Sequence, residues 1–421
     1  MLKQWLVLLL CFVGVVLTAQ AQQQTININQ DWYYWENNTK SYQLALENSS
    51  WQSITLPHTW NATDTVDTVP GYRRSASWYK RIIPAEAVNP EGLTQLYFEG
   101  ANFETEVYLN GQRVGEHTGG YIGFTFDITP FLNSTDNNEL LVRVSNRFNP
   151  NLIPSQKADF FLFGGITRDV WIKHVPTTHI TQTHVATPSV SKNQAQTQIS
   201  IELTSAQNQQ ANISIYLESP SGEPVSVEQK NVDLVTGNNS LTVDLPTLQD
   251  PQLWSPDSPS LYTVTVRLST ALGSMHTDSH SIGYRWFEMK PHQGFFLNGE
   301  RLLIRGTHRH EEHAGLGAAL PNAQHRKDME MIKQMGANFV RLGHYPQDPE
   351  VYQAANELGL LIWDELPWCR GGKGGKEWEA NTEYMLTSMI NQNMNHPSVI
   401  FGHWVTKCTG RKTLLEVVLM M

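Results

Sequence analysis

Residues 338–365 read NFVRLGHYPQDPEVYQAANELGLLIWDE, which is an apolar strand pattern, a helix pattern and a second apolar strand pattern in close succession. The first apolar run covers residues 338–342 and the second covers 360–363. Between them, Pro349 to Leu358 is predicted to be a helix. Parallel strands need such a crossover, so the stretch predicts a βαβ unit.

The same alternation continues on both sides of this unit. Further strands are expected at 302–306 and 398–401, and further helices at 323–335 and 377–395. Strands and helices that alternate at this spacing predict a parallel sheet. About half of an eight-stranded barrel is therefore expected over residues 285–401, as an incomplete (β/α)8 TIM barrel.

Upstream of residue 285 the chain shows strand patterns only. Residues 22–175 contain short alternating strands such as Glu106-Val107-Tyr108-Leu109, followed by the hairpin signal Asn110-Gly111, and predict a jelly-roll β-sandwich. Residues 176–284 are more polar and have the length of an immunoglobulin-like β-sandwich. The cysteine pair of antibody domains is absent there, so this likeness concerns architecture alone.

The first 21 residues have the pattern of a secretory signal peptide. One lysine precedes an apolar run from Trp5 to Leu17, and Ala19-Gln20-Ala21 follows as a small-x-small cleavage site. An uncleaved membrane anchor is the alternative, but the run is short for a bilayer. We expect cleavage near Ala21, a secreted or periplasmic protein, and no membrane attachment after cleavage.

The composition excludes some classes of partner. The net charge is -10 and no block of Lys or Arg occurs, which argues against nucleic acid and anionic membranes. Thirteen Trp and fourteen Tyr fit a carbohydrate binder, since sugar faces stack on aromatic rings. Beyond the signal segment only Cys369 and Cys408 remain, which form neither a disulfide scaffold nor a zinc site.

Charged and imidazole side chains are placed near the expected strand ends of the barrel. In such barrels the chemistry lies at the carboxyl ends of the strands. Three successive ends carry Arg305, His308 and His310, then Arg341 and His344, then Asp364 and Glu365. Many fixed hydrogen-bonding groups around one mouth suit a polyhydroxylated ligand. The two arginines could equally be inward barrel residues whose charges are matched by the two carboxylates.

Glu311-Glu312-His313 could suggest a metal site, but a consecutive run after a strand is more typical of a solvated loop. No metal is therefore predicted from these residues.

Separated strings of the chain resemble glycoside hydrolase family 2, in family order. They are Leu56-Pro57-His58-Thr59-Trp60-Asn61, Gly71-Tyr72-Arg73-Arg74, Gly164-Gly165-Ile166 with Arg168-Asp169-Val170, Leu253-Trp254-Ser255-Pro256, and Arg305-Gly306-Thr307-His308-Arg309-His310. The resemblance covers the chain from about Trp51 to Phe401 and implies the same order of sandwich, immunoglobulin-like domain and barrel.

The resemblance implies a β-galactosidase-like hydrolase that removes terminal non-reducing β-D-galactose with retention. Its substrate would be a β-galactoside or a plant or algal oligosaccharide, and full-length relatives can oligomerise. His310 and His344 would contact sugar hydroxyls, and Asp159 would reach the same pocket from the sandwich. The predicted substrate-binding set also includes Arg305, Arg341, Asp364 and Glu365.

Neither a metal nor a cofactor is predicted from the resemblance. Magnesium-dependent members of the family place a Glu and a His soon after the third strand, where this chain has Leu366-Pro367-Trp368-Cys369.

The two catalytic carboxylates that the resemblance implies are missing from this sequence. A retaining glycosidase needs a pair about 5 Å apart, and the family's acid/base Glu follows the fourth strand in an Asn-Glu pair. Here Gly402-His403-Trp404 follows instead. Back-translated and read in another frame, the tail permits Ala-Leu-Gly-Asn-Glu-Met-Tyr-Trp. We therefore hypothesise that residues 402–421 are frameshifted and that the chain alone is inactive.

Two alternatives stay open at this point. The enzyme could be a β-glucuronidase or a β-mannosidase of the same family, because the residues that distinguish these sugars are expected outside this part of the barrel. The chain could also be a non-catalytic carbohydrate-binding fragment in which the two sandwiches fold alone.

Overall fold

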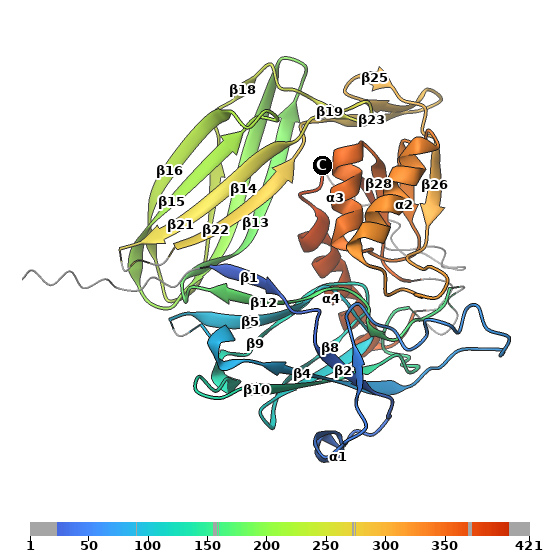
Figure 1. Cartoon of the computed structure of the whole chain (residues 1–421). Helices are drawn as coiled ribbons and strands as arrows, with labels where there is room; N and C mark the ends of the chain where they lie inside the picture. Colours follow the sequence, from blue (N-terminus) through green and yellow to red (C-terminus); the bar gives the residue numbers. More distant parts are fainter. Residues whose placement is uncertain are drawn as a thin grey trace, which may run out of the picture.

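The structure is a computed structural model that describes residues 23–89, 91–154, 158, 160–271, 273, 275–368 and 373–403. Three regions follow one another along the chain: a β-sandwich, a second all-strand domain, and a set of parallel strands with helices (Figure 1). The predicted signal segment and Trp404 to Met421 lie outside the described residues. Residues 401–403 are described by their backbone.

The first domain consists of two antiparallel sheets, ordered β1-β12-β5-β9 and β3-β2-β4-β10-β7-β8, with a small β11-β6 pair. Its elements are β1 (Gln24–Asn27), β2 (Trp32–Trp35), α1 (Tyr42–Leu46), β3 (Gln52–Ile54), β4 (Ala76–Ile83), β5 (Leu93–Phe98), β6 (Ala101–Asn102), β7 (Glu104–Leu109), β8 (Gln112–Thr118), β9 (Phe124–Asp127), β10 (Asn138–Ser145), β11 (Gly165–Ile166) and β12 (Val170–Val175), with short 3-10 turns at Ala85–Ala87 and Thr129–Phe131.

The sheets of the sandwich enclose one apolar core, which includes Trp32, Tyr79, Phe98 and Val142. The predicted hairpin at Asn110-Gly111 is confirmed: both residues have positive φ, and Leu109 pairs with Gln112 across the turn. Positive φ at both central residues is the requirement of a type I′ turn, which asparagine followed by glycine meets at low cost.

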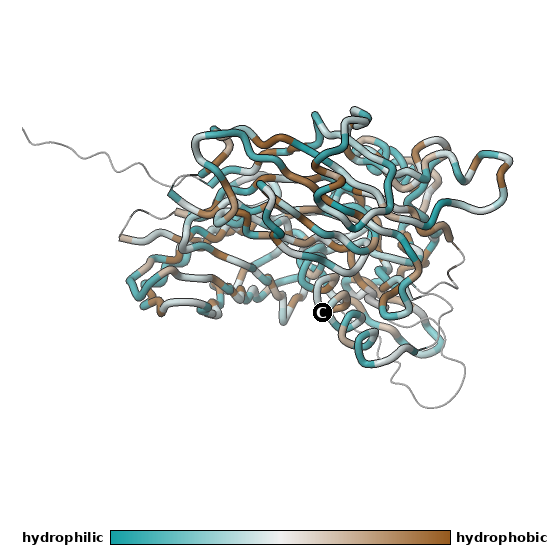
Figure 2. Tube along the Cα trace, turned by 90° about the horizontal axis from the view of Figure 1, so that it is seen from below, coloured by the Kyte–Doolittle hydropathy of each residue, from teal (hydrophilic) through white to brown (hydrophobic). Residues whose placement is uncertain are grey.

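The second domain is also a sandwich of two sheets, ordered β13-β14-β17, with β18 on β14, and β16-β15-β21-β22. Buried and more exposed residues alternate along these strands, for example in β14 and β21, as expected when one face of each sheet meets water. Figure 2 shows hydrophobic and hydrophilic positions interspersed along the chain. The strands are β13 (His179–Val190), β14 (Gln194–Ser205), β15 (Gln209–Glu218), β16 (Pro224–Leu234), β17 (Gly237–Asp244), β18 (Leu248–Gln249), β19 (Trp254–Ser255), β20 (Ser258–Pro259), β21 (Tyr262–Thr270) and β22 (Met275–Ile282).

The third region carries a parallel sheet in the order β26-β27-β28-β29, with each strand beside the next one in sequence. The expected helices are found within two residues of their predicted bounds. The elements are β23 (Phe287–Lys290), β24 (Gly294–Leu297), β25 (Glu300–Arg301), β26 (Gly306–Arg309), α2 (Asn322–Gln334), β27 (Phe339–Leu342), α3 (Pro349–Leu358), β28 (Leu361–Glu365), α4 (Lys376–Asn393) and β29 (Val399–His403).

The first parallel strand begins later than the sequence predicts. It covers Gly306–Arg309, whereas 302–306 was expected. The preceding apolar segment is extended but is tied to the side chain of Asn338, which accepts from the Arg305 amide (2.8 Å) and donates to the Leu303 carbonyl (2.9 Å). Leu302 and Ile304 pack on the apolar cluster at the base of the sheet. The strand was expected too early because an apolar segment that packs beside a sheet has the same sequence pattern as a strand within it.

The barrel strands and helices rest on both sandwiches. Ile122 and Ile153 of the first domain form a buried cluster with Trp378, Met385 and Met389 of α4 and with residues that follow β28. Trp254 of the second domain packs with Leu361 and Ile400 in another cluster. No helix among the described residues is long and apolar enough to cross a membrane.

Candidate active site

Three histidines lie together at the carboxyl ends of β26 and β27. His308 is in β26, His310 follows it, and His344 follows β27; their ring centroids are 5.1 to 5.8 Å apart. The parallel register, with His308 opposite Arg341, brings the two strand ends to one edge of the sheet. We call this group of three rings the histidine mouth. Its position is where (β/α) barrels carry their chemistry.

Glu365 at the end of β28 connects two members of the predicted set. Its carboxylate accepts from Nε of Arg341 (2.6 Å) and from Nη2 of Arg341 (3.0 Å), and Nδ1 of His344 lies 2.9 Å from Oε2. Only 2% of Glu365 is exposed. Burial by itself would raise the pKa of Glu365, but the hydrogen bonds from His344 and Arg341 outweigh it and the pKa lies below its ordinary value.

These contacts fix how His344 presents its ring. Nδ1 also lies 3.1 Å from Nη2 of Arg341, so it could accept there or donate to Glu365. The contact with the carboxylate is shorter and charge-assisted, which favours a proton on Nδ1. A neutral ring would then carry a lone pair on Nε2, which can accept from a sugar hydroxyl. Glu365 and Arg341 therefore act by holding His344.

Asp364 does not face the mouth, although the sequence placed it in the substrate-binding set. Neighbouring residues of a strand point to opposite sides, and Asp364 points to the helices. Its carboxylate accepts from the hydroxyl of Tyr352 in α3 and from Nδ2 of Asn393 in α4, both at 2.8 Å. Burial raises the pKa of Asp364 to about 6. This group joins the sheet to its helices and cannot reach a ligand.

Arg305 lies apart from the histidine mouth, and its predicted role in substrate binding stays a prediction. Because β26 begins at Gly306, Arg305 precedes the strand and lies at its amino end, with its side chain exposed. The histidine mouth is at the carboxyl end. The difference from the expected placement follows from the strand boundary, because a strand over residues 302–306 would put Arg305 near its carboxyl end.

The sandwich contributes to the same mouth. The ring centroid of Phe160 lies 5.6 Å from that of His310 and 6.1 Å from that of His344. Phe160 has no polar group, so no polar sequence signal marked it. Asp159, its neighbour in the chain, lies outside the described residues, and its predicted contact with the sugar stays a prediction.

Tyr345 links the mouth to the sandwich. Its ring stacks on Tyr121 with centroids 4.1 Å apart and an interplanar angle of 14°. The hydroxyl of Tyr345 accepts from the amide of Glu311 (3.0 Å) and lies 3.5 Å from Nδ1 of His310. Burial, and then the charge of Glu311, raises the pKa of Tyr345, so the phenol keeps its proton.

Glu311 is buried, which corrects the expectation of a solvated loop. It is 2% exposed, and its Oε2 accepts from Nη2 of Arg168 at 2.9 Å. Burial raises its pKa, but the Arg168 charge outweighs this, and the pKa of Glu311 lies below its ordinary value. Nothing in the local sequence pattern indicated that Glu311 is buried, because its partner Arg168 comes from another domain.

Glu311, His325 and Asp348 place one possible metal-ligand atom each within 4.8 Å of the others. Two guanidinium groups already occupy this cluster. Arg168 is bonded to Glu311, and Nη2 of Arg309 lies 3.1 Å from Nδ1 of His325. A cation would therefore meet like charge at short range. The absence of a metal stays a prediction.

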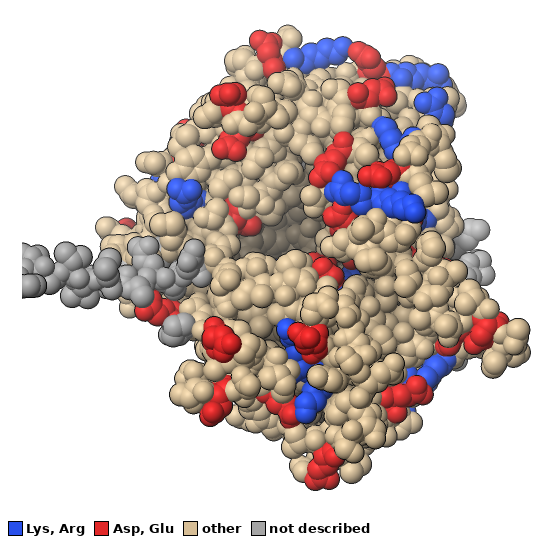
Figure 3. Space-filling view, in the orientation of Figure 1, with Lys and Arg blue, Asp and Glu red and all other residues tan. Residues whose placement is uncertain are grey.

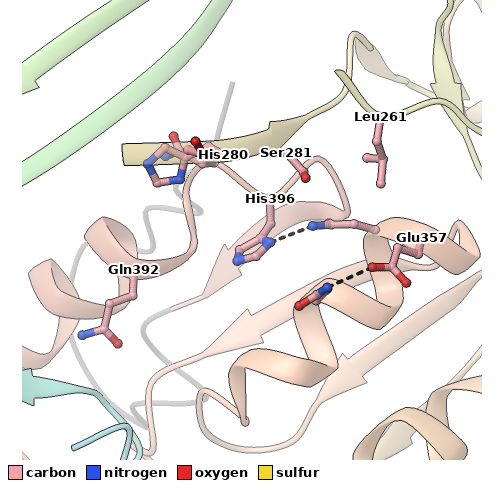
Figure 4. A pocket seen from close by; sticks show the side chains of 10 residues that line it. Leu261, His280, Ser281, Glu357, Gln392 and His396 are labelled. Atoms are coloured by element: carbon pink, nitrogen blue, oxygen red, sulfur yellow. Dashed lines mark hydrogen bonds between the residues drawn. The ribbon is translucent and has the colours of Figure 1, made fainter. Parts of the chain in front are cut away.

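A polar cavity of about 270 Å³ lies on the other side of the sheet, between the second sandwich and helices α3 and α4. Figure 4 shows His280, Glu357, Gln392 and His396 around it. Burial lowers the pKa of His396 to about 4, and Glu357 is ion-paired with Arg326. Figure 3 shows a hollow with few charged side chains where the three domains meet. The histidine and carboxylate groups of the cavity are engaged by its own walls, since His280 contacts Asp278, His396 contacts Asn356 and Glu357 pairs with Arg326.

Comparisons with known proteins match nearly the whole chain to one family. The sugar-binding domain of glycosyl hydrolases family 2 matches residues 20–176, the family 2 domain matches 178–285, and the family 2 TIM barrel domain matches 287–406. The expected order of jelly-roll sandwich, immunoglobulin-like domain and incomplete barrel is thereby confirmed.

The chain is similar to several glycosidases. A protein named putative beta-glucuronidase from Formosa agariphila is 52% identical over 374 residues, which is 89% of this chain and 45% of that protein. A beta-galactosidase from Thermoanaerobacter pseudethanolicus is 30% identical over 90% of this chain and 51% of its own length. Bacteroides uniformis beta-glucuronidase 2, solved covalently bound to cyclophellitol-6-carboxylate aziridine, superposes with a TM-score of 0.86 at 34% identity, covering 91% of this chain and 47% of that one. The chain thus spans about half the length of these relatives.

Proposed function

This chain belongs to glycosyl hydrolases family 2, and we propose that it carries sugar-binding residues of a retaining β-glucuronidase. The observation that most favours a glucuronide as substrate is the similarity to the F. agariphila protein, which is named a putative beta-glucuronidase. The covalent complex of the B. uniformis enzyme supports the same choice, since the bound inhibitor is a carboxylate-bearing compound.

The histidine mouth supports binding of a sugar ring. His310 and His344 offer imidazole nitrogens to hydroxyl groups, and Phe160 offers an apolar surface beside both. Carbohydrate sites combine fixed polar groups with aromatic faces in this way. The described mouth therefore recognises features that a glucuronide shares with other sugars.

Glu365 is unsuited to be the catalytic acid. A general acid needs a pKa raised toward the working pH, and the pKa of Glu365 is lowered by His344 and Arg341. Its carboxylate is also 2% exposed and fully engaged by these two residues. We therefore place the acid/base and the nucleophile on strand ends other than those of β26, β27 and β28.

A β-galactosidase is the second candidate. The His-rich string after the first strand favours it, as does the similarity to the T. pseudethanolicus enzyme. The two candidate substrates differ in the group on carbon 5 of the sugar, which is a carboxylate in a glucuronide and a hydroxymethyl group in a galactoside, and in the configuration of the hydroxyl on carbon 4. The only arginine we place at the mouth, Arg341, is already neutralised by Glu365.

The test compares two proteins, namely the 421-residue chain and a longer chain read in the alternative frame after the Phe401 codon. Both are assayed with the 4-nitrophenyl β-glycosides of glucuronic acid, galactose and mannose. We expect no turnover by the first protein. The second should prefer the glucuronide by on the order of 10²-fold or more in kcat/KM. A preference for the galactoside would overturn the proposed substrate.

We also propose that the protein is exported, on the basis of the pattern in residues 1–21. Amino-terminal sequencing of protein recovered outside the cytoplasm should find a chain that begins near Gln22. Recovery of an intact Met1 terminus would contradict export by cleavage.

A further inference from the structure

Arg168 of the first sandwich reaches into the barrel between two of its loops. It lies between β11 and β12 and is 2% exposed. Nη2 donates to Oε2 of Glu311 (2.9 Å) and to the carbonyl of Pro346 (2.6 Å). Nη1 donates to the carbonyl of Tyr121 (3.0 Å) within its own domain. One planar group thus joins the sandwich to two separate barrel loops.

The two loops that Arg168 holds are those that carry the histidines of the mouth. Glu311 follows His310 directly, and Pro346 lies two residues after His344. We propose that Arg168 is a positioning residue, which sets the relative placement of His310 and His344 from another domain. This inference rests on the proposed role of the mouth in sugar binding.

A second contact between the same partners supports this inference. Tyr121, whose carbonyl accepts from Arg168, stacks its ring on Tyr345. The Tyr345 hydroxyl in turn accepts from the Glu311 amide. The ring contact and the guanidinium therefore act on the same two barrel loops. The rigidity of a planar, five-donor group makes arginine suited to such bridging.

The placement of Arg168 is itself fixed by the sandwich. Ile166 and Val170 on either side belong to the sandwich core. A Cβ at Gly100 would lie 3.0 Å from Cδ of Arg168, so this glycine leaves room for the side chain. The backbone of Arg168 is therefore fixed by the sandwich core, and its guanidinium is fixed by Glu311 and Pro346 of the barrel. The position of the sandwich thus determines where the two barrel loops lie.

The buried charges make the contact hard to replace. The side chains of Arg168 and Glu311 are each 3% exposed, and the second oxygen of Glu311 accepts from the amide of Asp348 at the start of α3 (2.7 Å). Removal of the guanidinium would leave Glu311 as an unpaired buried charge. The loop must then move toward water, and His310 moves with it.

Arg143 provides a matched control. It is also a buried arginine of the sandwich, and its Nη1 donates to Oε1 of Glu106 at 2.7 Å, but both partners lie within the sandwich. Arg168→Met and Arg143→Met each remove one buried guanidinium from the same domain. Both should lower the melting temperature. Only Arg168→Met should alter the histidine mouth.

The experiment uses the 421-residue chain labelled with ¹³C and ¹⁵N in its histidines. The ring signals of His310 and His344 are assigned with His310→Gln and His344→Gln. We expect Arg168→Met to shift both signals and Arg143→Met to leave both in place. Unchanged signals in a folded Arg168→Met chain would overturn the proposal. The ring signals are measured without any glucuronide, so this experiment tests the positioning role of Arg168 independently of the proposed substrate.

Arg168→Lys serves if the Met variant does not fold. An ammonium group keeps a charge for Glu311 but cannot reproduce the fork that also reaches Pro346. The signal of His344 should then shift more than that of His310, and native positions for both would overturn the proposal. In the longer enzyme, kcat/KM should fall on the order of 10²-fold in Arg168→Met, because small displacements of binding groups are costly. It should stay within a few-fold of the parent in Arg143→Met.

Discussion

Glu365 holds two partners at once, and this makes its charge the critical property of the residue. In Glu365→Gln the shape is kept, but Arg341 loses its counter-charge and His344 loses the acceptor that favours a proton on Nδ1. Because the carboxylate is almost fully buried, we expect a loss of about 1.5–3 kcal/mol in the free energy of unfolding. Urea denaturation measures this, and ¹⁵N spectra of the His344 ring should report a change of tautomer.

Glu350→Gln is the control for this prediction. Glu350 pairs with Arg326 on the outer surface of the barrel helices, where both side chains are partly exposed. Such pairs contribute about 0–1 kcal/mol. Equal losses in the two variants, with no change in the His344 ring, would show that Glu365 has no special role.

The raised pKa of Asp364 predicts that the free energy of unfolding falls as the pH rises from about 4 to about 6. Its ordinary pKa of 3.8 is raised by burial to about 6 in the folded chain. Between these values the folded state binds more protons than the unfolded state, so this group makes stability fall as the pH rises. The effect is on the order of 3 kcal/mol. Denaturation of Asp364→Asn at several pH values should show a flatter dependence between about pH 4 and 6 than the parent. An unchanged slope would contradict the raised pKa.

The contrast between Asp364 and Glu365 could have been read from the sequence. Side chains alternate along a strand, so two adjacent acids cannot both face the mouth. The burial of Glu311 could not have been read in this way. Its partner Arg168 is 143 residues earlier, and only the docking of two domains brings them together.

At the scale of elements, the βα alternation predicted the helices to within two residues and three of the four parallel strands. The exception is β26, where Leu302-Leu303-Ile304 had a stronger strand pattern than the true strand. Gly306 begins β26 because a Cβ there would lie 2.6 Å from the Phe339 carbonyl, so the two strands approach closely. Close approach of backbones is not visible in an apolar pattern, so the sequence also misplaced Arg305 relative to the end of this strand.

We predict that the side chain of Asn338 holds the extended segment before β26 in place, by making the backbone hydrogen bonds that a neighbouring strand would otherwise make. Asn338→Ala removes two side-chain hydrogen bonds to the backbone of Leu303 and Arg305. Each of these partly buried bonds contributes about 0.5–1.5 kcal/mol, so we expect a loss of about 1–3 kcal/mol in the free energy of unfolding, measured by urea denaturation. Hydrogen exchange of the Arg305 amide should also become faster. Gln198→Ala, which removes an exposed bond to Asp244 in the second sandwich, should change neither quantity. Slow exchange at Arg305 in the Asn338 variant would contradict this role.

At the scale of the whole molecule, each sandwich has its own core but is not independent of the barrel. Trp254 is fully buried, donates from Nε1 to the carbonyl of Asn356 in α3 (2.9 Å), and packs on Leu361 and Ile400. Ile122 and Ile153 of the first sandwich are covered by α4. Without the parallel strands and helices these apolar surfaces would be exposed to water, so we expect the sandwiches to need the barrel elements for solubility.

This dependence predicts that one substitution has opposite effects in two forms of the protein. A fragment of residues 23–284 keeps the cores of both sandwiches and should fold, but it exposes Trp254 and should bind a hydrophobic dye and self-associate. Trp254→Ala should reduce dye binding and association of this fragment. In the 421-residue chain the same change leaves a cavity between domains and should cost about 3–5 kcal/mol. Light scattering, dye fluorescence and urea denaturation measure these effects. A parent fragment that stays monomeric without binding dye would show that the sandwiches need no cover, and the barrel would then be an appended domain instead of part of one packed unit.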